Sequence, residues 1–555
     1  MNPADITVLI PAAGRVPEGL IALSNIACPA MIPIAGRPVI HWTISYLRSL
    51  GVRKFTIAVS RPRMFVEEFV DSAFGQDCQI RFIVPSKDRG LGGTVMELAD
   101  TVTTAASLVV LGDTHFHFGD VDPNSSAEPF VLTQTVEDSY RWCIAEAGAD
   151  GRLLNLHDKQ PDVTCPLEAL IGVYYFPETT HLQSAARATV AAADAVGKRA
   201  EMAGILERVQ ANAPIRVARA AMWLDCGNVD MQARSHQALL QSRAFNELAI
   251  DPTLGTITKR SQHPQKFIDE INYLRLLPSD LQVLFPRVID YSIEWADPWV
   301  RLEYYGYPNL SEVFLFENVD AGIWERVFSH LGDILRDHFG AHRRPLPAGD
   351  VWDMYVGKTR KRLESLREQP ELGPLISHEG EVLVNGERLR NLSVLWPRIE
   401  EEVRRLETTT RGSVIHGDLC LSNILYDLRS RTCKMIDPRG SFGTVGIYGD
   451  PRYDVAKLWH SVHGLYDFIA NDLFRVSLHG TTIELSVRAT TAHREIENRF
   501  ASAFFRDESE RRDVQLITAL LFASMPALHY DKPQRQLAMY TRAVQLFGEY
   551  FAGTP

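Results

Sequence analysis

One stretch in the carboxy-terminal half constrains this chain more than any other. Residues 413–426 (SVIHGDLCLSNILY) read as a β-rich run, a tight polar loop and a second β-rich run, and residues 434–437 (KMID) follow after a short hairpin. The stretch contains Asp418, then Asn423 five residues later, then Asp437. Phosphoryl transfer needs a carboxylate that orients the acceptor hydroxyl, and an amide and a second carboxylate that hold magnesium. We therefore predict that Asp418 is the base and that Asn423 and Asp437 are Mg²⁺ ligands.

The spacing of His416, Asp418 and Asn423 resembles the catalytic loop of kinases. The loop lacks the arginine of protein kinases, and Asp437-Pro438-Arg439 stands where those enzymes carry Asp-Phe-Gly. In these departures, and in residues 449–458 (GDPRYDVAKL), the chain is similar to the aminoglycoside phosphotransferase and choline kinase group. The resemblance implies an α+β, protein-kinase-like two-lobed domain, with ATP as donor and a small-molecule acceptor. The alternative is a chance turn with a core asparagine.

The length of 555 residues is too great for one hydrophobic core, so we expect two or more domains. A formal net charge of -11 argues against a nucleic-acid partner and against binding to an anionic membrane. Anionic substrates would then be bound by local Lys and Arg side chains and by backbone amides.

The seven cysteines are scattered, odd in number and never spaced as Cys-x-x-Cys, which predicts reduced and mostly buried thiols. Residues 1–5 are polar and lead directly into a β-rich run, and no apolar run approaches the length of a membrane span. We therefore expect a cytoplasmic protein with no membrane insertion.

The amino-terminal half alternates β-rich and helical segments. Residues 6–10 are an apolar run that ends in the small-residue loop 11–15, where backbone N–H groups can bind a phosphate. An amphipathic helix, a strand at 54–59, a helix at 64–74 and a strand at 80–84 follow. This alternation predicts an α/β domain with a doubly wound, mostly parallel sheet.

The first strand, its loop and residues 29–42 (PAMIPIAGRPVIHW) resemble, in order, the sugar-phosphate nucleotidyltransferases, or nucleoside-diphosphate-sugar pyrophosphorylases. Residues 90–95 (GLGGTV) are similar to the base-contacting loop of that family. The resemblance covers about the first 240 residues and implies a GT-A-like fold. It assigns nucleotide binding to Ala13, Gly14, Gly93 and Thr94, and charge stabilisation to Arg15.

Two carboxylates extend this resemblance. Asp113 ends the β-rich run 107–113, and Asp225 lies in residues 222–228 (MWLDCGN), which match a Trp-x-Asp-x-Gly segment of the family. The resemblance implies that Asp113 and Asp225 jointly hold the Mg²⁺ that bridges nucleotide and sugar phosphate. A strand-end cap is the alternative role of Asp113.

Two further residues follow from the same resemblance. Lys159 is the candidate for binding the acceptor phosphate, and Gly172 belongs to a strand of the sugar-binding part. The His-x-His of His115 and His117 leaves two interpretations, a transition-metal site or loop histidines near the magnesium site.

The amino-terminal half departs from the family at two cationic positions. Family members carry Gly-x-Gly-Thr-Arg in the first loop and a lysine after the proline, where this chain has Ala30. Loss of such cations weakens stabilisation of a migrating polyphosphate charge. Arg15, Arg37 and Lys87 are candidate substitutes. Two hypotheses therefore stand, an active nucleotidyltransferase and a module that only binds a nucleotide-sugar or acts as a scaffold.

We place the domain boundary near residue 240, within a linking helix predicted over 231–249, so that the domains are 1–240 and 241–555. A small lobe is expected at about 245–310. There, strand residue Lys259 and helix residue Glu270 are the candidates for the pair that grips the nucleotide phosphates. Lys266 is the competitor of Lys259.

No glycine-rich loop precedes Lys259, so the turn 253–255 is expected to cover the phosphates. Residues 299–307 (WVRLEYYGY) end a strand like a kinase hinge, with Glu303 and Tyr305 as candidates for holding adenine. Plain core packing is the alternative for these aromatic residues. The large lobe, about 311–555, is expected to be helical.

Together these patterns predict a bifunctional enzyme. One half would phosphorylate a sugar or polyol with ATP, and the other would couple a sugar phosphate to a second nucleotide (UTP, CTP or GTP) and release pyrophosphate, for nucleotide-sugar or surface-polysaccharide precursors. The alternatives are a kinase with a regulatory amino-terminal half, a choline-type kinase and cytidylyltransferase, and a pseudokinase platform. The partners would be small molecules, and the choice between monomer and homo-oligomer stays open.

Overall fold

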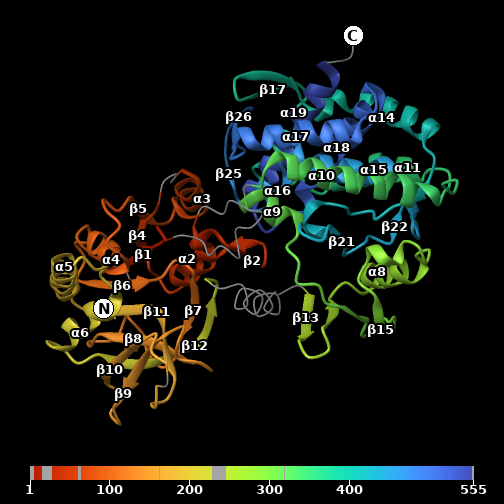
Figure 1. Cartoon of the computed structure of the whole chain (residues 1–555). Coiled ribbons are helices and arrows are strands. Elements are labelled where there is room, and N and C mark those ends of the chain that lie inside the picture. The colour runs from red at the N-terminus through yellow and green to blue at the C-terminus, as the bar shows by residue number, and fades with distance from the viewer. Residues whose placement is uncertain are drawn as a thin grey trace. The chain divides into compact units, whose positions relative to one another are not determined.

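The structure is a computed structural model that describes residues 5–14, 28–60, 64–161, 163–227, 246–317 and 319–552. The chain divides into two compact units, Met1–Leu239 and Leu240–Pro555 (Figure 1). Each unit is described below by itself.

The amino-terminal unit is built on one large sheet whose central order is β5-β4-β1-β6-β11-β8-β12-β7, with β9 and β10 attached beside β11. The strands of this order are β5 (Gln79–Ile83), β4 (Lys54–Ala58), β1 (Ile6–Pro11), β6 (Ala106–Val110), β11 (Glu168–Phe176), β8 (Phe130–Thr135), β12 (Arg216–Asp225) and β7 (Thr114–Phe118). The attached strands are β9 (Cys143–Ala147) and β10 (Leu153–Asp158).

The prediction of a mostly parallel sheet is correct for only part of it. β5, β4, β1 and β6 run parallel, but β11 pairs antiparallel with both β6 and β8, and β12 pairs antiparallel with β7. The sheet is therefore mixed. The long buried strand β11 carries the change in direction, and its apolar sequence EALIGVYYF does not reveal which way it runs.

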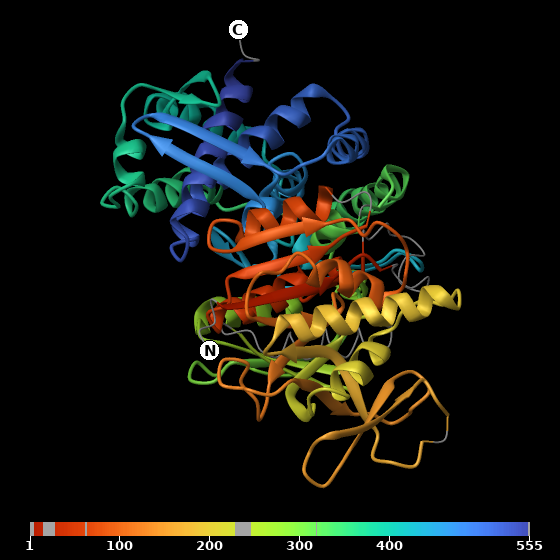
Figure 2. The ribbon, with the colours of Figure 1, turned by 90° about the vertical axis from the view of Figure 1, so that its left-hand side faces the viewer.

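Helices cover this sheet because their apolar stripes match its buried faces. They are α2 (Val39–Ser49), α3 (Met64–Phe74), α4 (Leu91–Ala99), α5 (Thr179–Ala195) and α6 (Met202–Gln210). One core cluster joins Leu98 of α4, Leu182 of α5 and Ile205 of α6 to Leu9 and Val109 of the sheet. Figure 2 shows α5, in yellow, running along this face. The predicted helix at 64–74 is confirmed by α3.

The carboxy-terminal unit begins with an antiparallel sheet of order β13-β14-β16-β15. Its strands are β13 (Asn246–Asp251), β14 (Thr256–Ser261), β15 (Val288–Ser292) and β16 (Trp299–Glu303). Helix α8 (Pro264–Leu276) packs Phe267 and Ile271 against Val300 of β16. The linking helix predicted over 231–249 is wrong at its end, because 246–249 belong to β13. Its remaining residues, 231–245, lie outside the described part.

The remainder of this unit is mainly helical. The longer helices are α9 (Leu310–Phe316), α10 (Ala321–Asp333), α12 (Lys358–Glu364), α14 (Leu392–Thr409), α15 (Pro451–Val462), α17 (Thr491–Phe504), α18 (Glu508–Ser524) and α19 (Pro533–Ala552). Short helices are α11 (Asp350–Trp352), α13 (Leu372–Ser377) and α16 (Tyr466–Ala470). The stretch singled out in the sequence forms the hairpin β20 (Ile424–Asp427) and β21 (Thr432–Met435), as predicted.

A second four-stranded sheet interrupts these helices and was not predicted. Its order is β18-β17-β26-β25, and its strands are β17 (Glu381–Val384), β18 (Glu387–Arg390), β25 (Phe474–His479) and β26 (Thr482–Val487). The two hairpins are about 90 residues apart in sequence and join through β17 and β26. Within the described ranges, no helix has both the length and the apolar run of a membrane span.

Candidate functional site

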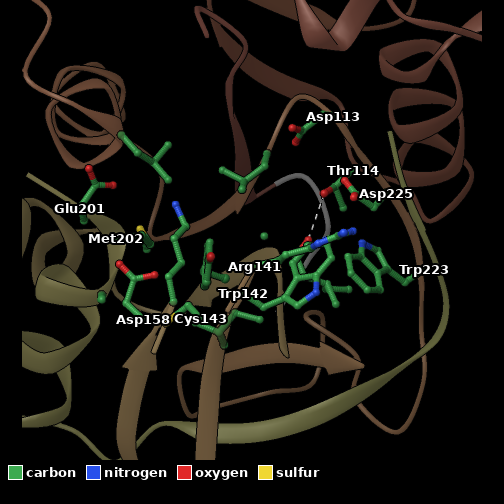
Figure 3. Close-up of a pocket in the computed structure, with 18 residues that line it drawn as sticks. Asp113, Thr114, Arg141, Trp142, Cys143, Asp158, Glu201, Met202, Trp223 and Asp225 are labelled. Atoms are coloured by element: carbon green, nitrogen blue, oxygen red, sulfur yellow. Dashed lines mark hydrogen bonds between the residues drawn. The ribbon is translucent and has the colours of Figure 1, made fainter. Parts of the chain in front are cut away.

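The amino-terminal unit contains a cavity of about 210 Å³ at the end of its sheet (Figure 3). In this view Asp113 and Asp225 lie on one side of the cavity and Asp158 and Glu201 on the other. The lining comes from the strands β7, β9, β10, β11 and β12, from the first residues of α4 and α6, and from the segments beside them.

Asp113 and Asp225 are brought together by backbone contacts. Asp113 lies in the turn after β6, and its carbonyl accepts a hydrogen bond from the Cys226 amide at 2.9 Å. The Gly227 amide donates to Oδ1 of Asp225 at 3.1 Å. A Cβ atom on Gly227 would lie 2.6 Å from Oδ2 of Asp113, so only glycine fits between the two carboxylates.

The two carboxylates share a buried environment. Burial, together with the neighbouring Asp113, raises the pKa of Asp225 from 3.8 to about 6. Burial also raises the pKa of Asp113. The buried Asp225 carboxylate and the half-buried Asp113 carboxylate favour a divalent cation between them, and oxygen ligands of this kind suit Mg²⁺. The residues present therefore fit the metal predicted from the sequence.

Lys159 and Gly172 line the same cavity. Lys159 follows β10 with φ of 50°, and its amide donates to the Trp142 carbonyl at 2.9 Å. Gly172 has φ of 82°, and a Cβ there would lie 2.7 Å from the Leu111 side chain. The structure therefore brings these two predicted residues and the two carboxylates to one place.

The predicted base-contacting loop, residues 90–95, forms the start of helix α4. Gly93 and Thr94 lie in the first turns of α4, and the Thr94 amide donates to the Gly90 carbonyl at 3.2 Å. A Cβ on Gly93 would lie 2.4 Å from Cβ of Arg89, so this glycine allows close packing within the described chain. Neither residue lines the cavity, whereas Leu91 at the start of α4 does.

The first loop is described only in part. Ala13 and Gly14 follow β1, and neither is among the residues that line the cavity. Arg15 lies outside the described residues. Ala30, which stands where the family carries lysine, is fully buried. A Cβ atom added to Gly112 would lie 3.2 Å from Cβ of Ala30.

The cavity-lining residues that sequence reasoning missed include Arg141, Trp142, Glu201 and Trp223. The rings of Trp142 and Trp223 meet edge to face with centroids 5.0 Å apart. Trp223 belongs to the same Trp-x-Asp-x-Gly segment as Asp225. The match of that segment to the family could therefore have identified Trp223 as a site residue. Arg141 and Trp142 precede β9 in an irregular segment, where no periodicity marks them.

His115 and His117 lie on strand β7, so their interpretation as loop histidines is wrong. Their rings meet edge to face with centroids 5.4 Å apart, and His117 stacks on Tyr46. Burial lowers the pKa of His115 to about 3. Within the described residues, no group of three or more His, Cys, Asp or Glu side chains is arranged to hold a metal ion. His115 is buried and His117 is half-buried.

In the carboxy-terminal unit, a buried carboxylate binds the backbone of the loop that carries Asp418. Asp454 of α15 accepts hydrogen bonds from the amides of His416, at 2.6 Å, and Gly417, at 2.9 Å. Its side chain is 1% exposed. Burial raises the pKa of Asp454 to about 7, although the two amide donors work in the opposite direction. The loop that carries Asp418 is therefore fixed to a helix that lies outside it.

The His416 ring joins this loop to the following hairpin. Its Nδ1 accepts from the Asp418 amide at 3.2 Å, and its Nε2 contacts the Ile436 carbonyl at 3.0 Å. The two partners assign the proton to Nε2. Burial lowers the pKa of His416 to about 4, so the ring is neutral at pH 7. One imidazole therefore sets the spacing between Asp418 and Asp437.

Lys259 forms ion pairs with two carboxylates. Its Nζ lies 2.7 Å from Oε1 of Glu270 and 2.7 Å from Oδ1 of Asp437. Burial lowers the pKa of Lys259, but the two carboxylates outweigh it and keep the ammonium charged. Lys266 is exposed and has no ion pair among the described residues. The predicted contact between Lys259 and Glu270 is therefore present.

Asp418 lies beside a cation of its own. Nζ of Lys457 is 2.8 Å from Oδ1 of Asp418, whose side chain is 42% exposed. Burial works to raise the pKa of Asp418, but the Lys457 ammonium holds it well below its usual range. Nδ2 of Asn423 donates to the Asp418 carbonyl at 2.9 Å, which leaves the Asn423 side-chain oxygen as the acceptor. Asp437 is 48% exposed, and its carboxylate is the kind of oxygen ligand that suits Mg²⁺.

The hinge candidates contact each other. The Tyr305 hydroxyl donates to Oε2 of Glu303 at 3.0 Å, and Arg287 lies 3.2 Å from the same carboxylate. The turn 253–255, which is expected to cover the phosphates, has two amides that bind within the chain. Oδ1 of Asp251 accepts from the amides of Thr253 and Leu254 at 3.0 Å each, so these two donors already have a partner.

We predict that Asp225→Asn stabilises the metal-free protein at neutral pH. The folded-state pKa of about 6 exceeds the ordinary 3.8, so the ionised carboxylate costs stability above about pH 6 and costs nothing below about pH 4. Thermal unfolding in a chelator should show a gain of up to about 3 kcal/mol at pH 7.5 and no gain at pH 4. A loss of stability at pH 7.5 would contradict this account. Excess Mg²⁺ should reverse the order of the two proteins.

We predict that Asp454→Ala destabilises the carboxy-terminal unit. Two buried amides lose their acceptor, at a cost of about 1–3 kcal/mol each. Urea unfolding should show the loss, and hydrogen exchange should be faster at His416 and Gly417. Asp454→Asn keeps one acceptor oxygen and should lose less. Equal stability of Asp454→Ala and the natural chain would refute the proposed support of the loop.

Comparisons with known proteins concern the amino-terminal region. A family model described as Nucleotidyl transferase matches residues 17–242. Glucose-1-phosphate thymidylyltransferase of Streptomyces griseus is 24% identical over 175 residues, which are 30% of this chain and 49% of the relative. The chain thus spans about half the length of this curated relative.

Two solved structures are similar to the same region. The first is a UDP-glucose pyrophosphorylase complexed with UDP-glucose, at 16% identity and a TM-score of 0.36, covering 43% of this chain and 99% of that one. The second is HddC from Yersinia pseudotuberculosis, at 15% identity and a TM-score of 0.33, covering 42% and 99%. On the family match, the amino-terminal region of the chain contains a nucleotidyl transferase domain.

Proposed function

We propose that the amino-terminal unit couples a sugar phosphate to a nucleoside triphosphate. The observation that carries the proposal is the pair Asp113 and Asp225 beside a cavity that also contains Lys159. Such a cavity has a negative end for a metal and a cation for the acceptor phosphate. It matches the chemistry of the family whose model the region fits.

The reaction needs positioning and charge neutralisation. A phosphate oxygen of the sugar phosphate attacks the α-phosphorus of the nucleotide, the bond to the bridging β-phosphate oxygen breaks, and pyrophosphate leaves. Lys159 would hold the attacking phosphate, and Glu201 would accept hydrogen bonds from sugar hydroxyls. Mg²⁺ held by Asp113 and Asp225 would neutralise charge on the phosphates.

This activity predicts pyrophosphate release from a panel of sugar 1-phosphates with each common nucleoside triphosphate and Mg²⁺. Asp113→Asn and Asp225→Asn should each lower the rate by at least about 10²-fold, because both remove a metal ligand. Asp120→Asn, at an exposed carboxylate of the same unit, is the matched control and should keep full activity. A coupled pyrophosphate assay gives the rates.

The same panel tests the alternative function. If no combination releases pyrophosphate while nucleotide binding persists, the unit is a nucleotide-sugar-binding or regulatory module. The specific observation in favour of this alternative is the buried Ala30, since no cation projects from that position.

We further propose that the carboxy-terminal unit is an ATP-dependent small-molecule kinase with two lobes. Support comes from the ion pairs that join Lys259 to Glu270 and Asp437, and from the hydrogen bonds of His416 that connect Asp418 to the same hairpin. In kinases a lysine of this kind holds the nucleotide phosphates, and a catalytic-loop carboxylate receives the acceptor proton.

Each site residue would have its own role in phosphoryl transfer. Asp418 accepts the proton of the acceptor hydroxyl, whose oxygen attacks the γ-phosphorus while the bond to the β-phosphate oxygen breaks and ADP leaves. Lys457 keeps Asp418 ionised. Asn423 and Asp437 would hold Mg²⁺, which neutralises the phosphates. The edge near Glu303 and Tyr305 would hold the adenine.

Two consecutive steps on one chain would make an activated sugar or polyol for nucleotide-sugar or polysaccharide synthesis. In this scheme the kinase produces the phosphate that the amino-terminal unit couples to UTP, CTP or GTP. A choline-type kinase joined to a cytidylyltransferase is the nearest variant. A pseudokinase platform would bind ATP without turnover.

Asp418→Asn should lower ATP-dependent phosphorylation by about 10²–10⁴-fold with the fold intact, because the base is lost. Asp437→Ala should lower the rate together with its dependence on Mg²⁺. Asp333→Asn, at an exposed carboxylate of the same unit, is the control. ADP production measures turnover, and circular dichroism checks the fold. Turnover of Asp418→Asn at the natural rate would remove Asp418 from the mechanism.

A further inference from the structure

Four basic side chains surround Asp418. Lys358 and Arg362 come from α12, Arg439 comes from the segment after β21, and Lys457 comes from α15. The chain as a whole carries a net charge of -11, so this cluster is not the product of a basic surface. We call these four residues and their surroundings the α12 cation cluster.

Two members of the α12 cation cluster contact Tyr453. Its side chain is 1% exposed. The Lys358 ammonium lies over its ring, 5.5 Å from the centroid, and Nη1 of Arg439 lies 3.3 Å from its hydroxyl. Lys358 and Arg439 thus meet at one buried aromatic residue, whose neighbour Asp454 binds the loop that carries Asp418.

The cluster has more positive charge than negative. Lys457 is paired with Asp418 at 2.8 Å. Among the described residues, Lys358, Arg362 and Arg439 have no carboxylate within 4.0 Å. Nζ of Lys358 contacts Sδ of Met354 at 3.4 Å, and Nη1 of Arg362 contacts the Ser524 hydroxyl and carbonyl at 3.3 Å each.

This arrangement is unfavourable without a ligand. Burial and the neighbouring Arg439, Arg362 and Lys457 lower the pKa of Lys358 well below its usual value. Burial and Arg439 also lower the pKa of Arg362. Partly buried cations that repel one another favour binding of an anion, which supplies the missing counter-charge.

The cation expected to bind the donor nucleotide, Lys259, is not part of the α12 cation cluster. Lys259, which contacts Asp437 and Glu270, is the residue expected to hold the ATP phosphates, with Mg²⁺ at Asp437. The α12 cation cluster is instead linked to Asp418 through Lys457, where the acceptor hydroxyl is expected to bind. Its excess charge therefore belongs to the acceptor side of the reaction.

We propose that the acceptor of the kinase unit is a hydroxyl compound that already carries an anionic group, a phosphate monoester or a carboxylate, and that Lys358, Arg362 and Arg439 bind that group. The proposal rests on the kinase function proposed above and names its substrate class. It excludes neutral sugars and polyols, and cationic alcohols such as choline, as preferred acceptors.

Matched acceptors test the proposal on the full chain with ATP and Mg²⁺. Each carbon skeleton is offered in neutral, carboxylate and phosphate forms, for example glycerol, glycerate and glycerol 3-phosphate, and a hexose, its uronate and its 6-phosphate. Choline is added as the cation. We expect kcat/KM for an anionic form to exceed that of its neutral form by at least about 10²-fold, which a bidentate charged contact can supply. The comparison of carboxylate with phosphate identifies the anion. Preferred turnover of a neutral or cationic acceptor would overturn the proposal.

Variants separate the acceptor from the donor. Lys358→Met and Arg362→Gln should raise the KM for the anionic acceptor by at least about 10-fold and leave the KM for ATP unchanged. Lys361→Met removes an exposed charge from the same helix and should behave like the natural chain. A rise in the KM for ATP with an unchanged acceptor KM would assign the cluster to the nucleotide and refute the proposal.

A measurement without turnover distinguishes failure of this inference from failure of the kinase function. Titration with inorganic phosphate, followed by the shift in unfolding temperature, should give an affinity that falls at least about 5-fold in Lys358→Met and Arg362→Gln but not in Lys361→Met. If no compound consumes ATP, the kinase function fails, and the phosphate titration still decides whether the cluster binds an anion. Equal phosphate affinity in all four proteins would overturn the inference.

Discussion

The carboxylate of Asp454 supports the carboxy-terminal site. A buried carboxylate is stable only when donors surround it, and here the donors are the backbone amides of His416 and Gly417. The same contacts satisfy two buried amides of the loop that carries Asp418. The His416 ring then reaches the Ile436 carbonyl, so the hairpin that ends at Asp437 is held at a fixed distance. A helix distant in sequence thus determines the geometry of the whole loop.

Charge imbalance marks both candidate sites, with opposite sign. In the amino-terminal unit burial and Asp113 both raise the pKa of Asp225, and the pair of carboxylates favours a cation. In the carboxy-terminal unit Lys358 and its basic neighbours favour an anion, while Lys259 is already neutralised by Glu270 and Asp437. Folding alone would not select either imbalance, because each lowers the stability of the empty protein. The ligands proposed above would offset this cost at both sites.

The sequence allowed the local features to be predicted, and it failed where distant segments meet. The helix at 64–74 and the contact of Lys259 with Glu270 follow from short-range pattern and spacing. The antiparallel direction of β11 and the sheet of β17 and β26 depend on pairing between remote strands, which an apolar run does not encode. Lys358 and Arg362 read as ordinary polar residues of a helix. Their proximity to Asp418, on which the proposed role depends, arises only in the folded chain.

The backbone of Asp437 adopts φ of 57°, a left-handed conformation that costs a residue with a side chain about 1 kcal/mol. Glycine would adopt the same conformation without that penalty. A chain optimised only for durability would therefore lose the carboxylate at this position. If Asp437 holds Mg²⁺ as proposed, thermostabilising redesign of this protein has to keep aspartate at position 437. This holds even though substitution by glycine would relieve the backbone strain there.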